Sequence, residues 1–236
     1  MSRALAADWT TLAALAIERL GAAGHITEAD PRGAVSPATW RRLLELVVAW
    51  NARVDLTAAR SAEELVDLYL ADALVLAAAA RASDLPWSIS SRSGALGDDE
   101  RGGSLWIDVG SGGGAPGIPL AMLLPEAKLT LVESRAKRVA FLRTAHGTLG
   151  LEGVELMRDR SESLPAGAWD VAVSRATLPP PRWLEEGARL ARQAVWVLLA
   201  RGDAPEHEGW RSAIDLTYRW PLTGVERRAL CYVPAL

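Results

Sequence analysis

The chain has 236 residues, of which 50% are hydrophobic and 23% are charged, and its formal net charge is −3. This length allows a sizeable core, and the composition excludes wholesale disorder. The single cysteine, Cys231, excludes an internal disulfide and a cysteine-cluster metal site, so we expect a protein of the reducing cytoplasm. No apolar run approaches the ~20 residues that span a bilayer, and we expect neither a membrane segment nor a signal peptide.

The first part of the chain predicts helices. Apolar residues recur at helical spacing over residues 12–20, 40–48 and 65–82. Ser36-Pro37 offers an N-cap hydroxyl followed by proline at the first helical position, and Ser61-Ala-Glu-Glu64 has the spacing of a capping box. We therefore predict a helical extension over residues 1–82.

A change of composition follows this extension. Residues 83–104 are rich in serine, glycine and aspartate, and we interpret them as a loop or an insertion. From residue 105 onward, apolar runs at 105–109, 128–133, 154–157, 169–174 and 194–200 predict strands with helices between them. Residues 215–220 and 226–232 predict a terminal hairpin. Such alternation is typical of an α/β fold with a mostly parallel sheet, here over residues 105–236.

The most informative segment is a glycine-rich loop, Asp108-Val-Gly-Ser-Gly-Gly-Gly-Ala-Pro-Gly117, which follows the first of these strands. Ligands of open α/β sheets bind at the carboxyl ends of strands, and glycines let a ligand approach the backbone closely. The triplet Gly112, Gly114 and Gly117 matches the dinucleotide fingerprint literally, so NAD is one candidate ligand.

Acidic residues beside the loop favour a different ligand. A carboxylate at Asp108 repels a pyrophosphate but suits an ammonium group, and Glu133 can accept hydrogen bonds from ribose hydroxyls. Together with Gly110 and Gly112, these two residues favour S-adenosylmethionine over NAD.

Four segments resemble one known family. Residues 108–142 (DVGSGGGAPGIPLAMLLPEAKLTLVESRAKRVAFL) resemble the bacterial small-subunit ribosomal RNA guanine-N7 methyltransferases, also called glucose-inhibited division protein B. WNARVDLTA at 50–58, Arg160-Ser161-Glu162 and Ser174-Arg175-Ala176 are similar to three further family motifs. The similarity covers about residues 36–203.

The resemblance implies a class I methyltransferase fold, which is Rossmann-like with a mostly parallel seven-stranded sheet and an N-terminal helical extension. It also implies methyl transfer from S-adenosylmethionine to N7 of a guanine in 16S rRNA. The implied partner is 16S rRNA or the 30S subunit, and we expect a monomer without a metal ion. The residues expected to contact the cofactor are Asp108, Gly110, Gly112, Ala115, Glu133, Ser161, Glu162 and Arg175.

Several positions depart from the family pattern. A family His-x-x-Asp-Ser motif has Tyr69 and Ala73 in place of its histidine and serine, and a family lysine is Arg201. The asparagine of the family's Asn-Leu-Thr is Asp55. We expect these positions to face the RNA, so the substrate is less constrained than the cofactor.

Methylation at guanine N7 needs no proton removed first, so proximity and alignment carry the chemistry. We assign no certain catalytic residue; Arg175 and Arg201 are the candidates for positioning. His25, His146 and His207 show no metal-ligand spacing. Three alternatives stay open: a methyltransferase for a small molecule or a protein, an NAD-dependent oxidoreductase, and a non-catalytic RNA-binding protein.

Overall fold

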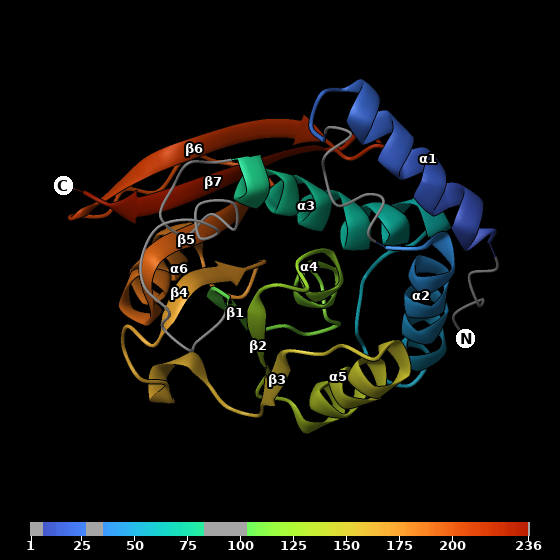
Figure 1. Ribbon diagram of the computed structural model, residues 1–236, viewed down its shortest axis with the longest axis horizontal. Helices are drawn as coiled ribbons and strands as arrows, with labels where there is room; N and C mark the ends of the chain where they lie inside the picture. The colour runs from blue at the N-terminus through green and yellow to red at the C-terminus, as the bar shows by residue number, and fades with distance from the viewer. Residues whose placement is uncertain (1–6, 27–34, 83–102, 236) are drawn as a thin grey trace.

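The computed structural model describes residues 7–26, 35–82 and 103–235 (Figure 1). Three helices precede the sheet: α1 (Trp9–Ala22), α2 (Pro37–Asn51) and α3 (Ala62–Ala82). They confirm the helices predicted from the periodicity. Most of the predicted loop, residues 83–102, lies outside the described residues. In the part of the chain that is described, no helix is long and apolar enough to cross a membrane.

Side-chain caps begin the second and third helices. The Ser36 hydroxyl accepts a hydrogen bond from the Thr39 amide at 3.2 Å, and the Ser61 hydroxyl accepts one from the Glu64 amide at 3.1 Å. The Glu64 carboxylate reaches back to the amide of Arg60 at 2.8 Å rather than to that of Ser61. The predicted capping box is therefore present, with its return bond displaced by one residue.

A seven-stranded sheet follows, in the order β3-β2-β1-β4-β5-β7-β6. Its strands are β1 (Leu105–Val109), β2 (Lys128–Val132), β3 (Val154–Met157), β4 (Trp169–Ser174), β5 (Ala191–Leu199), β6 (Trp210–Arg219) and β7 (Glu226–Pro234). Strands β1 to β5 pair in parallel, and β7 pairs antiparallel with both β5 and β6. The predicted parallel sheet and terminal hairpin are confirmed. The strand order reverses between β1 and β4, which is where such sheets bind ligands.

Helices cover both faces of this sheet: α4 (Gly117–Leu123), α5 (Ala136–Leu149) and α6 (Pro180–Leu190), with a 3-10 turn η3 at Ser161–Ser163. Side chains alternate along each strand, so Trp106 and Ile107 enter different hydrophobic clusters. One cluster joins the sheet to helices α1 to α5, and the other joins the opposite face to α6. The helical extension thus shares a core with the sheet, and its boundary at residue 82 stays a prediction about chain organisation.

Two buried carboxylates on α3 hold the β6–β7 hairpin, which runs alongside this helix in Figure 1. Asp67 accepts hydrogen bonds from the amide and the hydroxyl of Thr223 at 2.8 and 2.7 Å. Asp72 accepts from the Tyr218 hydroxyl at 2.7 Å and from the Trp220 indole at 3.0 Å. Because buried carboxylates are costly unless they are paired, these contacts fix the hairpin against the helix.

Candidate functional site

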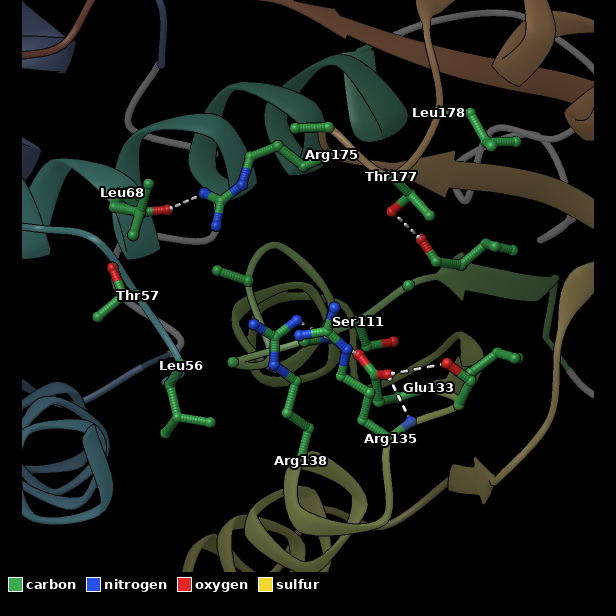
Figure 2. Close-up of a pocket in the computed structure, with 18 of the residues that line it drawn as sticks. Leu56, Thr57, Leu68, Ser111, Glu133, Arg135, Arg138, Arg175, Thr177 and Leu178 are labelled. Atoms are coloured by element: carbon green, nitrogen blue, oxygen red, sulfur yellow. Dashed lines mark hydrogen bonds and ion pairs between the residues drawn. The ribbon is translucent and has the colours of Figure 1, made fainter. Parts of the chain in front are cut away.

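A cavity of about 950 Å³ opens at the carboxyl ends of β1, β2 and β4 (Figure 2). Its walls come from the segment after α2, the first half of α3, the glycine loop, the end of β2 with the start of α5, the residues around η3, the loop after β4 and the β6–β7 hairpin. The residues expected to contact a cofactor that line it are Gly110, Gly112, Ala115, Glu133, Ser161, Glu162 and Arg175. The fold therefore brings seven of the eight predicted cofactor positions into one cavity.

The glycine loop is held by backbone contacts to β2. The amides of Gly110 and Ser111 both donate to the carbonyl of Val132, at 2.8 and 3.0 Å. Gly110 has φ +71°, and a Cβ there would come within 2.2 Å of the Thr177 hydroxyl. Glycine is required at this position by both the conformation and the space. The loop therefore lies tightly between β2 and the segment after β4.

Glu133 presents a fixed carboxylate to the cavity. It is only 5% exposed and accepts hydrogen bonds from the amide of Gly112 at 3.1 Å and the amide of Arg135 at 2.8 Å, with a longer contact from the Ser134 hydroxyl at 3.4 Å. The Nη1 atom of Arg138 lies 3.9 Å from the Oε2 atom of Glu133, and Figure 2 shows the two side chains beside each other. A carboxylate offers about four acceptor positions, so Glu133 keeps capacity for the hydroxyls of a ribose.

Asp108 does not line the cavity. It is 1% exposed beneath the loop, and its Oδ2 has no hydrogen-bond partner. A Cβ added at Gly117 would approach that oxygen to 2.4 Å, so the carboxylate lies against the first residue of α4. Burial raises the pKa of Asp108 to about 6. Of the two carboxylates expected to flank the ligand, only Glu133 faces the cavity.

The position of Asp108 separates the two candidate ligands. A dinucleotide places its pyrophosphate at the N-terminus of the helix after the glycine loop. Here the Asp108 carboxylate lies against that N-terminus, and the residue before the helix, Pro116, has no amide hydrogen to offer. The structure therefore disfavours NAD at this loop.

Arg175 connects the loop after β4 to α3. Its Nη1 donates to the carbonyl of Leu68 at 2.6 Å, as Figure 2 shows, and lies 3.8 Å from Asp72. It is 23% exposed on the side chain and lines the cavity. Arg201, the other positioning candidate, does not line this cavity but lies in the loop after β5, at a neighbouring one.

Two of the family departures are buried, so the expectation that they face the RNA is wrong. Tyr69 and Ala73 are 1% and 0% exposed on α3. The Tyr69 hydroxyl donates to the carbonyl of Gly113 at 2.5 Å, and burial raises its pKa. This tyrosine therefore holds the glycine loop to the helical extension, a role that the sequence did not indicate.

The segment with Asn51 and Asp55 shapes another wall of the cavity. The Asn51 side chain accepts from the amides of Leu56 and Thr57 at 2.9 and 3.0 Å. Arg138 donates to the backbone carbonyl of Asp55 at 2.8 Å. Because the contact uses the backbone of residue 55, it does not depend on whether this residue is asparagine or aspartate.

The fold and the glycine-loop cavity define a class I S-adenosylmethionine-dependent methyltransferase, as the resemblance implied. A family model named GidB, described as rRNA small subunit methyltransferase G, matches residues 38–218. The chain belongs to this family. A relative from Pseudomonas aeruginosa called ribosomal RNA small subunit methyltransferase G is 37% identical over 166 residues, which are 70% of this chain and 68% of the relative.

A second relative and a solved structure are also similar to this chain. A Myxococcus xanthus protein with the same name is 31% identical over 208 residues, covering 81% of this chain and 85% of the relative. Among solved structures, a SAM-dependent methyltransferase from Aquifex aeolicus matches 57% of this chain and 84% of its own chain at 18% identity, with a TM-score of 0.43.

Among the described residues, no group of three or more histidine, cysteine, aspartate or glutamate side chains could hold a metal ion.

Proposed function

We propose that the chain transfers a methyl group from S-adenosylmethionine to N7 of one guanine in 16S rRNA of the small ribosomal subunit. The observation that carries this proposal is the cavity beside the fixed Glu133 carboxylate, in a chain that matches the rRNA methyltransferase family over residues 38–218. We further propose that the enzyme acts as a monomer in the cytoplasm.

The cavity residues fit the parts of S-adenosylmethionine. Glu133 would hold the ribose hydroxyls, because its oxygens are already oriented by two backbone amides. Ser161 and Glu162 lie across the cavity, where they would contact the adenine. The backbone of Gly110 and Gly112 would lie along the amino-acid part. The orphaned Oδ2 of Asp108 places negative charge beneath the same loop, which suits a cationic ligand.

The cofactor, when bound, supplies an electrophilic methyl group on a sulfonium. The protein's own residues then need to align the acceptor, because guanine N7 already carries a free lone pair. This reaction needs no general base and no covalent nucleophile, so we assign neither role to a residue of the cavity. Arg175 would position the incoming base, since its anchor on Leu68 fixes the guanidinium at the cavity wall. This alignment is the main contribution expected of the protein.

Incubation with radiolabelled S-adenosylmethionine tests the proposal. The substrates are 30S subunits and naked 16S rRNA from a strain that lacks this activity. We expect one N7-methylguanine per 16S rRNA, located by borohydride and aniline cleavage followed by mass spectrometry. Label that survives nuclease treatment of the substrate, or no transfer to either RNA form, would contradict the proposal.

A further inference from the structure

A second cavity of about 470 Å³ adjoins the first. It lies between the loop after β4, the end of β5 and the β6–β7 hairpin. The two cavities share Arg175, Leu178, Trp220 and Arg227 in their walls, so a ligand in one would approach a ligand in the other. The volume lies within the ordinary range for small-ligand sites. This cavity has the size and position for an acceptor group.

The walls of the second cavity combine aromatic and cationic groups. Trp183, Tyr218 and Trp220 contribute aromatic rings. Arg175 and Arg201 contribute guanidinium groups from the ends of β4 and β5. Aromatic rings and guanidinium planes are the groups on which proteins stack unpaired bases.

Arg227 has the most specific geometry of these residues. Its guanidinium carbon lies 4.0 Å from the centroid of the Trp220 ring, in a cation–π contact. Trp220 is 4% exposed, and its indole donates to the buried Asp72 at 3.0 Å. The tryptophan is therefore fixed, and it holds the Arg227 guanidinium at the junction of the two cavities.

We infer that the second cavity receives the target guanine and that Arg227, held over the Trp220 ring, is the residue that stacks on it. This inference rests on the proposed function. Arginine pairs readily with the O6 and N7 edge of guanine, but N7 has to stay free to accept the methyl group. Stacking contacts the face of the base and leaves that lone pair accessible. A planar cation on an indole thus suits the reaction better than an arginine directed at the N7 edge.

Three variants test the role of Arg227. Arg227→Gln removes the charge and the stacking contact, and Arg227→Lys keeps the charge but removes the plane. Arg219→Gln is the matched control, because Arg219 lies on the same hairpin, is 71% exposed and lines neither cavity. For each variant, kcat and KM for 30S subunits are measured at fixed salt, the Kd for S-adenosylmethionine by calorimetry and the Tm by thermal unfolding.

We expect Arg227→Gln to lower kcat/KM for the RNA about 10- to 100-fold, as the loss of one base-stacking contact would. Arg227→Lys should stay at least about fivefold impaired, while Arg219→Gln should stay within about threefold of the wild type. The Kd for S-adenosylmethionine should change less than about threefold in all three variants, because Arg227 comes from β7 and not from the glycine loop or the end of β2, where the cofactor is placed.

The outcomes separate this inference from the proposed function. A wild-type enzyme that does not methylate 16S rRNA overturns both. If the wild type is active, the inference alone fails when Arg227→Gln behaves like Arg219→Gln, or when Arg227→Lys restores full activity. It also fails when Arg227→Gln loses cofactor affinity as much as RNA activity, because Arg227 then serves the cofactor.

Discussion

The glycine loop and the contact between α3 and the hairpin both hold the site, but they use different parts of the chain. The loop is fixed mainly by backbone amides and one carboxylate within residues 108–135, and Tyr69 of α3 adds one contact from outside this range. The hairpin is fixed by the side chains of Asp67 and Asp72, whose partners lie about 150 positions later. The contacts of the loop thus join backbone groups that are close in sequence, whereas the contacts of the hairpin join buried carboxylates to donors that are distant in sequence. The comparison indicates that two walls of the site have different supports: local contacts hold the glycine loop, and contacts to α3 hold the hairpin residues that line both cavities.

The largest loss of stability is expected where α3 holds the β6–β7 hairpin. Asp72→Ala removes the acceptor for Tyr218 and Trp220 and the carboxylate nearest Arg175. Because buried polar partners are left unpaired, we expect the free energy of unfolding to fall by about 3–5 kcal/mol in urea titrations. The control, Glu45→Ala, breaks an exposed pair with Arg41 and should cost less than about 1 kcal/mol. Equal losses of unfolding free energy in the two variants would show that Asp72 contributes no more to stability than an exposed ion pair does.

The carboxylate beneath the loop should affect the pH dependence of stability. The folded pKa of Asp108 is raised to about 6, so ionisation destabilises the folded state. The protonated Asp108 carboxyl therefore stabilises the folded state relative to the ionised one. This contribution to the free energy of unfolding is fully present below the unfolded pKa of ~3.9 and is lost as the pH rises through about 6. Relative to the wild type, Asp108→Asn should therefore gain roughly 2 kcal/mol of unfolding free energy between pH 4 and pH 8. Parallel pH profiles for the two proteins would contradict the burial argument.

A change in the contacts of the glycine loop should be detected as a change in affinity for the cofactor. Glu133→Gln keeps the shape of the side chain but removes the charge that orients the loop and meets the ribose. We expect the Kd for S-adenosylmethionine to rise about 10- to 100-fold by calorimetry, since hydrogen bonds to charged groups contribute about 1.5–3 kcal/mol. Glu152→Gln, an exposed residue outside the cavity, is the control. An unchanged Kd in Glu133→Gln would place the ribose elsewhere.

Much of the local region could be predicted from the sequence. Strands β1, β3 and β4 coincide with the apolar runs at 105–109, 154–157 and 169–174, because each run is short and has a glycine and a polar residue within two positions of its ends. The hairpin was predicted less well: β6 begins at Trp210, five residues before the expected start at Asp215. It is an edge strand in which only one residue is fully buried, so its hydrophobic alternation is weak.

The contacts of α3 could not be predicted. This helix is buried around most of its circumference, so its apolar pattern does not tell which residue faces the glycine loop and which faces the hairpin. Tyr69 and Asp72 are three residues apart but contact Gly113 and Trp220, respectively. Only the packing of distant segments assigns these partners. The burial of Asp108 was missed for a related reason, since the sequence places it at a strand end but does not give its direction.

The smallest effect is expected where the two regions meet. Tyr69→Phe removes only the hydroxyl that donates to the Gly113 carbonyl and leaves the ring in place. We expect a loss of about 1 kcal/mol in unfolding free energy and a Kd for S-adenosylmethionine raised about two- to fivefold, because the loop loses one anchor. Tyr69→His, which introduces the family residue, should restore part of the affinity if its ring reaches the same carbonyl. A Tyr69→Phe variant with wild-type stability and affinity would mean that the loop is held without this contact.

The most direct test of the account is a crystal structure with S-adenosylhomocysteine bound. We expect both ribose hydroxyls within hydrogen-bond distance of Glu133 and the adenine beside Ser161, with the second cavity left open toward Arg227. A ligand bound outside the glycine-loop cavity, or inside it without contact to Glu133, would contradict the account.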